Sequence, residues 1–332
     1  MIRLSLAFLM LCASPLHASD EVSTKPDSSQ IGALKSLQIL DERLHRIGYQ
    51  LITANEPFCR SSGPKTGLLL HDIRQYGNKE AARTVFGFPR EVSIHAVVPG
   101  SPADLAGLKA GDGLIAVNDF SLEDYAASDK PADSDKNVLH RLNRFKILLE
   151  QNSVAIAVLR NGQRIEASLD PVPACRSRFE IKPNRKREAS ADGQIVSISS
   201  ALAEYFESDD EFAAVAAHEL AHNLLRHRDR LNAQKVNRGF FGQFGKSAGR
   251  IKDTEIEADR LSVWLMANAG YDPRAAIRFW TRYGKEHGKG IFSASTHYRW
   301  KKRVRLFEEE LAKMADVEAS ESGRHPPLLK LP

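Results

Sequence analysis

Apolar residues recur at spacings of three and four along residues 30–52 of this 332-residue chain. This spacing places them on one face of an amphipathic helix, because an α-helix completes a turn every 3.6 residues. The stripe consists of Leu34, Leu37, Leu40, Leu44, Ile47 and Leu51. We expect residues 19–58 to form an N-terminal helical segment that packs on the body of the protein. A coiled-coil dimer seam is less favoured, because fewer than four heptads are present.

From Cys59 to Cys175 the apolar spacing changes to two, which is typical of strands with one buried face. One alternating set is Val92, Ile94, Ala96 and Val98. Two more sets flank the sequence RNGQ, with Val154, Ile156 and Val158 before it and Ile165, Ala167 and Leu169 after it. Asn161-Gly162 predicts a tight hairpin there, since both turn positions need positive φ. These patterns predict a β-rich domain over residues 59–175, with a helix at residues 137–151.

Within this region, VVPGSPADLAGLKAGDGLIAVNDFSL at residues 97–122 resembles the middle of PDZ domains attached to bacterial periplasmic proteases. The resemblance implies that an extended peptide is bound as an added strand beside a helix, with loop amides receiving its terminal carboxylate. Two segments compete for that loop, KTGLLL around Gly67 and VFGF around Gly87. Residues 123–136 are expected to be a polar surface insertion. His140 on the groove helix is a candidate for selecting a ligand side chain, although an ordinary surface histidine is the simpler interpretation.

After Cys175 a basic run at residues 176–188 leads through a strand-like segment at residues 193–199 into helices. We interpret this run, and RWKKRVR near the C-terminus, as solvated faces and expect no nucleic-acid binding, because aromatic residues for base stacking are not interleaved. The net charge of +5 says little about partners, because 47 basic residues nearly balance 42 acidic ones. Peripheral contact with an anionic membrane surface stays open.

The segment EFAAVAAHELAHNL, residues 211–224, places three titratable side chains in a sequence otherwise suited to a buried helix. Ser208 and Glu211 predict a capping box, so the helix is expected to begin there. His218 and His222 then lie four apart on one face, where both can bind one metal ion, and Glu219 lies beside them to act on a metal-bound water. This HExxH pattern is typical of zinc proteases, but it needs a third ligand to support it.

Candidates for the third ligand lie downstream. His227 is the nearest, but the metzincin spacing is excluded because positions 225 and 228 hold leucine and arginine instead of glycine and histidine. Glu255 and Asp259 in DTEIEAD lie four apart on one helical face. Glu257 is expected to point away from the face of Glu255 and Asp259 and to cap that helix together with Thr254. We therefore predict Glu255 as the third ligand.

HELAH followed by EIEAD and GYDP resembles the metallopeptidase family of the HtpX heat-shock protease, the CAAX prenyl protease and the mitochondrial protease Oma, over about residues 179–314. The resemblance implies a mostly helical zinc endopeptidase domain with a small sheet whose edge strand holds the substrate. It also implies that one zinc ion is bound by His218, His222 and Glu255, and that Glu219 is the catalytic base. Asp259 is implied to orient a ligand histidine or to assist proton transfer.

Other features of this family are only partly present. The resemblance implies a histidine, with an arginine six residues beyond it, near the end of the domain; His297 and Arg303 match, while Tyr298 replaces a proline. Both are candidates for polarising the scissile carbonyl or stabilising the oxyanion, with a structural role as an equal alternative. Glu188-Ala189 stands where the family has Asn-Ala at the start of the substrate strand. Residues 237–249, with three phenylalanines and four glycines, are expected to form a lid over the cleft rather than an ordinary connection.

Residues 1–18 predict a secretory signal, with Arg3, the apolar run LSLAFLMLCA and a small residue at Ala18. A lipoprotein anchor at Cys12 is disfavoured because a leucine precedes it. The signal predicts export to the periplasm. In that oxidising compartment Cys59 and Cys175 are expected to form a disulfide, and two free thiols are the alternative.

With 42% hydrophobic and 27% charged residues, the chain has a globular composition and is long enough for two domains. We predict an α+β fold with a PDZ-like domain at residues 59–175, a zinc peptidase domain at residues 176–318 and a tail at residues 319–332. The predicted function is a zinc endopeptidase for misfolded envelope proteins, in which the PDZ domain recruits substrate or regulates access. The alternative is a peptide-binding or chaperone-like protein with a structural zinc site. The sequence does not indicate whether the protein is a monomer or an oligomer.

Overall fold

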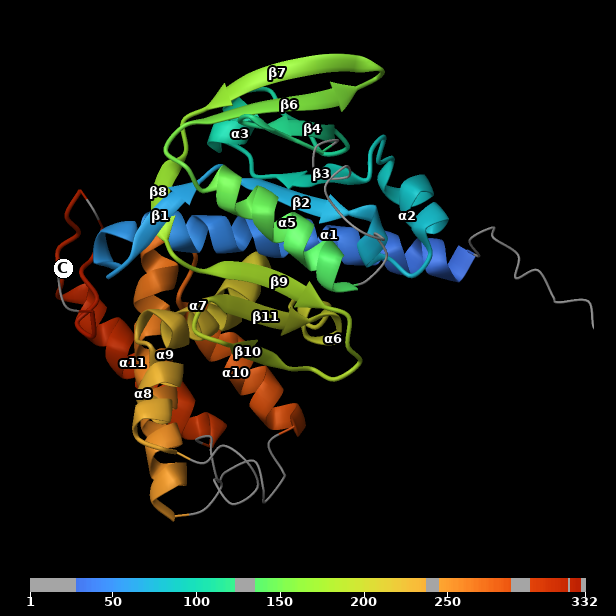
Figure 1. Cartoon of the computed structure of the whole chain (residues 1–332). Coiled ribbons are helices and arrows are strands. Elements are labelled where there is room, and N and C mark those ends of the chain that lie inside the picture. Colours follow the sequence, from blue (N-terminus) through green and yellow to red (C-terminus); the bar gives the residue numbers. More distant parts are fainter. Residues whose placement is uncertain (1–27, 123–134, 237–244, 288–298, 322, 330–332) are drawn as a thin grey trace, which may run out of the picture.

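A computed structural model describes residues 28–122, 135–236, 245–287, 299–321 and 323–329 (Figure 1). The expected signal at residues 1–18 lies outside these ranges, as do residues 123–134 of the expected polar insertion. Among the helices described, none has the length and apolar character that crossing a membrane requires. Helices and antiparallel sheets both contribute, and the α+β prediction is confirmed.

Helix α1 (Ser28–Ala54) lies between a β-rich unit and a helical unit, drawn above and below it in Figure 1. Its apolar stripe is buried from Leu40 onward, and most of that stripe belongs to the hydrophobic core of the helical unit. Gly48 allows close approach to β9 (Arg178–Lys182), because a Cβ at this position would lie 2.3 Å from the Phe179 ring. The helix also contacts β3 (Val92–Val97) and α2 (Lys79–Phe86) of the β-rich unit. It therefore packs on the body of the protein, as predicted, and joins both units.

The β-rich unit is an antiparallel sheet in the order β2-β3-β4-β6-β7, with β5 paired to β4. Its other strands are β2 (Leu68–Asp72), β4 (Gly113–Val117), β5 (Phe120–Ser121), β6 (Val154–Arg160) and β7 (Gln163–Leu169). Its other helices are η2 (Ile73–Gln75), α3 (Pro102–Leu105) and α5 (Asp135–Leu149). Helix α5 packs against β2 and β4 and buries Phe145 in the core of this unit. The groove helix is therefore present within two residues of its predicted bounds.

The hairpin between β6 and β7 has the register that the alternating residues predict. Val154 pairs with Leu169, and Val158 pairs with Ile165. Asn161 and Gly162 adopt φ values of 50° and 78°, so both turn positions lie in the left-handed region. Asparagine and glycine tolerate this region best, which is why the dipeptide specified the turn.

The two glycines that compete for the carboxylate loop have different positions. Gly67 immediately precedes the outer strand β2, adopts φ +80° and lies so close to Ser101 that a Cβ would meet its side chain at 2.3 Å. Gly87 ends α2 as a left-handed cap, with its amide donating to the Arg83 carbonyl. Only Gly67 therefore begins a strand that lies beside α5.

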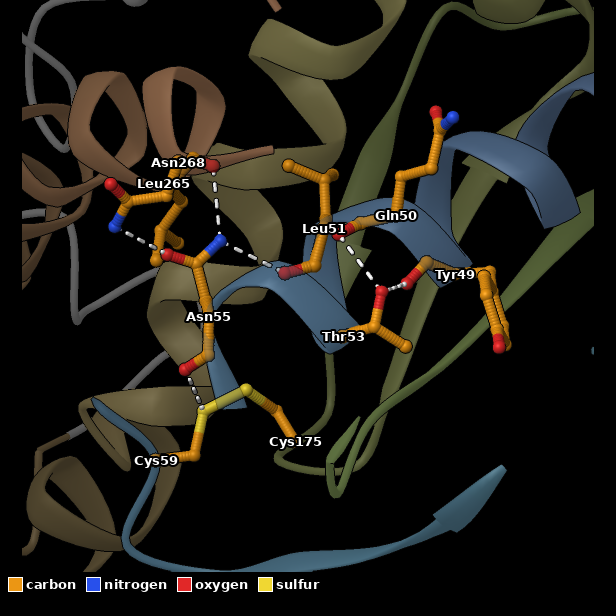
Figure 2. Close-up of a disulfide and its surroundings, with 9 residues drawn as sticks. All are labelled: Tyr49, Gln50, Leu51, Thr53, Asn55, Cys59, Cys175, Leu265 and Asn268. Atoms are coloured by element: carbon orange, nitrogen blue, oxygen red, sulfur yellow. Dashed lines mark hydrogen bonds between the residues drawn. A yellow bond between two sulfur atoms is a disulfide. The ribbon is translucent and has the colours of Figure 1, made fainter. Parts of the chain in front are cut away.

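The chain enters and leaves the β-rich unit at one place. β1 (Ser62–Lys65) pairs with β8 (Val172–Cys175), and a disulfide joins Cys59 to Cys175 with 5.6 Å between their Cα atoms. The predicted disulfide is thus present, at the base of the β-rich unit. In Figure 2 it lies beside Asn55, whose Nδ2 donates to the carbonyl oxygens of Leu51 (2.9 Å) and Leu265 (3.0 Å). This buried amide ties the end of α1, just before η1 (Glu56–Phe58), to helix α9.

The helical unit combines a small sheet, in the order β10-β11-β9, with a bundle of helices. β9 and β11 are parallel, and β10 is antiparallel to β11. The remaining elements are β10 (Ala189–Ala191), β11 (Ile195–Ser199), α6 (Ser200–Ala203), α7 (Asp209–Leu224), α8 (His227–Ala233), α9 (Gly245–Asn268), α10 (Arg274–His287) and α11 (Trp300–Ala315). Helix α7 packs against α1, α9, α10 and the sheet, so it is the centre of this unit. Leu329 of the expected tail is buried in the same core.

Candidate metal centre

Helix α7 begins at the predicted cap but uses it differently. The Ser208 hydroxyl accepts the Glu211 amide at 3.2 Å, which is the expected first half of a capping box. The Glu211 carboxylate, however, accepts the Glu207 amide at 3.0 Å and pairs with Arg282 of α10. The reciprocal bond of a capping box is therefore replaced by an interhelical ion pair that fixes the start of α7 against α10.

The structure brings together His218, His222 and Glu255, from α7 and α9. The two Nε2 atoms lie 3.2 Å apart, and the Glu255 oxygens lie 3.5 Å from His218 Nε2 and 3.4 Å from His222 Nε2. Atoms bound at 2.0–2.1 Å around one tetrahedral zinc ion lie about 3.3–3.4 Å apart. The three side chains therefore fit a zinc ion in both spacing and donor type, and two histidines with one glutamate are a donor set of catalytic zinc sites.

Asp259 lies one turn after Glu255 on α9, behind His218. It is fully buried, and its Oδ1 lies 2.9 Å from His218 Nδ1. When the proton of this contact lies on Nδ1, Nε2 carries no proton. The Nε2 lone pair is then directed at the other two ligands. Burial alone lowers the pKa of His218, but hydrogen bonding to Asp259 and Glu255 raises it to about 9.

Arg303 of α11 contacts both Asp259 and His218, whose Nδ1 lies 3.2 Å from a terminal nitrogen of the guanidinium. Its Nε donates to Asp259 Oδ2 at 2.7 Å, and its terminal nitrogen binds Oδ1 of the same carboxylate. The guanidinium also lies 3.5 Å from the centre of the Trp280 ring. Burial opposes ionisation of Asp259, yet the charges of Arg303 and His218 hold the pKa of that carboxyl below its usual value. Arg303, Asp259 and His218 thus form one buried row of hydrogen-bonded side chains.

A second row lies behind His222, and the sequence analysis missed it. His227 Nδ1 is 2.8 Å from His222 Nδ1, and His227 Nε2 is 2.9 Å from Glu257 Oε2. Arg230 also binds Glu257. Hydrogen bonding to His227, assisted by Arg230, lowers the pKa of Glu257 to about 2 against the effect of burial. An ionised Glu257 accepts from His227 Nε2–H, so His227 Nδ1 is free to accept from His222 and directs the His222 Nε2 lone pair forward.

The predicted role of Glu257 as a helix cap is therefore wrong. Helix α9 begins at Gly245, so Glu257 lies in its interior, and Thr254 donates to the carbonyl of Ile251 instead of capping the helix. His227, considered as a third ligand, lies behind His222 instead. The five-residue spacing between His222 and His227 was the signal available in the sequence. The helix breaks between α7 and α8, and this break turns His227 back toward His218 and His222.

Glu219 follows His218 on α7 and is 9% exposed. Burial is the main reason that the pKa of its carboxyl rises to about 7, with the Glu255 carboxylate adding to the effect. Ala189 begins β10, one of the two edge strands of the small sheet, and the backbone carbonyl of Glu188 just before it accepts the Ser199 amide at 3.0 Å. β10 packs near α7, so this edge lies in the same region as the histidine pair. His297 and residues 237–244 of the expected lid lie outside the described residues, while residues 245–249 form the start of α9.

Comparison with known proteins gives two family matches. Residues 177–311 match the model of peptidase family M48, and residues 93–127 match the model of the PDZ domain. The chain therefore carries an M48 metallopeptidase domain and a PDZ domain, and both resemblances inferred from motifs are confirmed. The described residues of the two matches belong to the helical unit and to the β-rich unit respectively.

The relatives include three curated proteins. The mitochondrial metalloendopeptidase OMA1 of Schizosaccharomyces pombe is 33% identical over 31% of this chain and 37% of its own length. The protein of the same name from Arabidopsis thaliana is 31% identical over 40% of this chain and 32% of its own length. The "Putative beta-barrel assembly-enhancing protease" of Vibrio cholerae is 26% identical over 51% of this chain and 39% of its own length. The chain thus spans less than two-fifths of each of these relatives.

Proposed function

We propose that this chain is a zinc-dependent endopeptidase whose catalytic ion is held by His218, His222 and Glu255. The observation that carries the proposal is the 3.2–3.5 Å spacing of their three donor groups, within a segment that matches a metallopeptidase family. A structural zinc ion is usually enclosed by four protein ligands. The group of potential ligands found among the described residues at this place has three members, which favours a catalytic site with a position for water.

A zinc ion held by His218, His222 and Glu255 would supply a Lewis acid for the peptide carbonyl and would lower the pKa of a bound water toward about 7. Glu219 accepts the proton from the attacking water and returns it to the leaving amine. Asp259 and His227 hold the two histidines in the tautomer that presents Nε2. We assign Arg303 to positioning of Asp259, because its guanidinium is buried against that carboxylate and Trp280.

The substrate in this proposal is an extended segment of a protein. The outer edge of β10 would hold the scissile segment as an added strand, since its other edge already pairs with β11. The PDZ domain would hold a peptide between β2 and α5, with the loop at Gly67 receiving a terminal carboxylate. The disulfide is consistent with an oxidising compartment, so we retain misfolded envelope proteins of the periplasm as the proposed substrates.

Digestion of an unfolded protein such as casein tests this function. Glu219→Gln should lower the cleavage rate about 10²–10⁴-fold, the usual contribution of a general base, while zinc content stays at the wild-type level. His218→Ala should lose the ion as well as activity. A chelator should abolish wild-type cleavage, and added zinc should restore it.

Glu309→Gln on the exposed face of α11 is the matched control, and it should cleave at the wild-type rate. Undiminished cleavage by purified Glu219→Gln protein would refute the assignment. Zinc-bound wild-type protein that suppresses aggregation of casein without cutting it would instead support the chaperone-like alternative.

A further inference from the structure

A second group of potential metal ligands lies between α1 and the β-rich unit. It consists of Asp41 from α1, His71 from β2 and His95 from β3. One ligand atom from each of the three lies within 4.8 Å of the others. The group is remote in sequence from the HExxH motif, and no motif in the chain pointed to it.

His95 is the most informative member because its buried polar atoms are not satisfied. The residue is 1% exposed, and neither ring nitrogen has a hydrogen-bond partner among the described residues. Leaving such a group unpaired is costly, and a bound water or ion is a usual explanation for it. An acidic group lies close by, because Asp41 Oδ2 is 3.5 Å from His95 Nε2.

That separation is long for a hydrogen bond but suits two ligands of one ion. His218 Nε2 and Glu255 Oε2 are also 3.5 Å apart. Donors on a tetrahedral zinc ion lie about 3.3–3.4 Å apart. The Asp41–His95 pair therefore has the same spacing as a pair in the candidate catalytic site.

His71 is prepared to act as a ligand through one nitrogen. Its Nδ1 hydrogen-bonds the Tyr76 hydroxyl, which leaves Nε2 available, as in many metal-binding histidines. The rings of His71 and His95 are stacked with centres 3.7 Å apart. Their ring planes are within 9° of parallel, so binding of one ion by both requires the partly exposed His71 ring to tilt out of the stack.

We propose that Asp41, His71 and His95 form a second metal site for a divalent transition metal of the zinc class. Two imidazoles and one carboxylate favour zinc over magnesium or calcium, which prefer oxygen ligands. The site would fasten α1, whose Leu44 and Ile47 lie in the core of the helical unit, to the strands of the PDZ domain. One of these strands is β2, which borders α5, so the ion would also fix the position of the proposed peptide groove.

Metal stoichiometry tests the proposal without reference to catalysis. The His218→Ala/His222→Ala protein, dialysed against zinc, should retain one ion per chain by elemental analysis. Adding His95→Phe should remove that ion, and phenylalanine suits a site already bordered by Phe86 and Phe88. Adding Asp41→Asn instead should weaken zinc binding more than about 100-fold, since even loss of an outer-shell partner costs 10–100-fold. His287→Ala, at an exposed histidine, is the matched control and should leave the ion bound.

A second measurement covers poor folding of the double variant. Wild-type protein should contain two ions per chain and His95→Phe one, and Co²⁺ exchanged into the wild-type protein should give two separable sets of visible absorption bands. The proposal is overturned if the His218→Ala/His222→Ala protein binds no zinc while wild-type protein binds one ion. It is equally overturned if His95→Phe retains two.

Discussion

The two histidine–carboxylate clusters differ in how the chain assembles them. In the first, His218 and His222 lie one turn apart on α7, so the geometry of a single helix brings them together. In the second, Asp41, His71 and His95 come from a helix and two strands and meet only when α1 packs on the sheet. Local periodicity can be recognised in a sequence, whereas a meeting of three distant elements leaves no pattern there.

The clusters also differ in what lies behind them. Each histidine of the first has a row of partners: Asp259 and Arg303 behind His218, and His227 and Glu257 behind His222. In the second, His71 bonds Tyr76, while neither ring nitrogen of His95 has a hydrogen-bond partner in the part of the chain that the structure describes. The first cluster is therefore held in one geometry before an ion arrives, and the second must adjust its rings to bind one.

Exchanging two carboxylates for amides, Asp259 behind the first cluster and Asp41 within the second, should separate the clusters most strongly. Asp259→Asn leaves the buried Arg303 guanidinium without its counter-charge, so the free energy of unfolding should fall by about 3–5 kcal/mol. Asp41→Asn should cost less than about 1 kcal/mol, because burial raises the pKa of Asp41 and favours the neutral form that asparagine imitates. Urea unfolding in a chelator measures both. Equal losses would show that the two carboxylates support the fold in the same way.

Much of the local structure was predictable because short-range rules determine it. The Asn161-Gly162 turn set the β6–β7 register, and Ser208 marked the start of α7. The proposed ligands His218, His222 and Glu255 were selected by helical spacing and family resemblance, and their roles stay predictions. Their proximity is compatible with those roles.

What sequence reasoning missed depends on how elements end and pack. Helix α9 starts at Gly245, inside the segment expected to be a lid, because Ala248 and the following turns pack into the unit. Because the helix begins earlier than expected, Glu257 lies in its interior and contacts His227 instead of capping the helix. The segment at residues 19–58 was predicted to pack on the body of the protein, and Leu44, Ile47 and Leu51 lie within the core of the peptidase domain itself. No periodicity distinguishes a helix that packs beside a core from one that completes it.

Removal of the disulfide tests the junction between the helical unit and the β-rich unit, which supplies two residues of the second cluster. Cys59 and Cys175 are separated by 116 positions, and the bond closes the β-rich unit at its base. Cys59→Ser/Cys175→Ser should lower the free energy of unfolding by about 2–4 kcal/mol, mainly by enlarging the unfolded ensemble. Calorimetry of the variant and of wild-type protein gives the difference. The zinc content of the first cluster should be unchanged, since its ligands lie on α7 and α9, and its loss would show that the junction supports both clusters.

The smallest expected effect concerns the ion pair between α1 and α7, the helices that carry Asp41 and His218. Asp209, in the first turn of α7, pairs with Arg43 and Arg46. Although burial opposes ionisation, the two arginines hold the pKa of Asp209 below its usual value. An acid whose pKa is lower in the folded state stabilises the fold above its unfolded pKa of about 3.9, and this contribution disappears as the pH falls through the folded value.

The Asp209 side chain is 39% exposed, so solvent screening limits the contribution to less than about 1 kcal/mol. Asp209→Asn should therefore destabilise the protein by up to this amount at pH 7, and by progressively less below about pH 4. Urea unfolding at several pH values measures the change, with Asp229→Asn, in the exposed Arg226–Asp229 pair within one turn of chain, as the control. Because the pair joins the helix of one cluster to the helix of the other, a loss well above 1 kcal/mol would mean that the two clusters are coupled through α1. A loss within the expected range, independent of zinc, would mean that each cluster depends on its own unit.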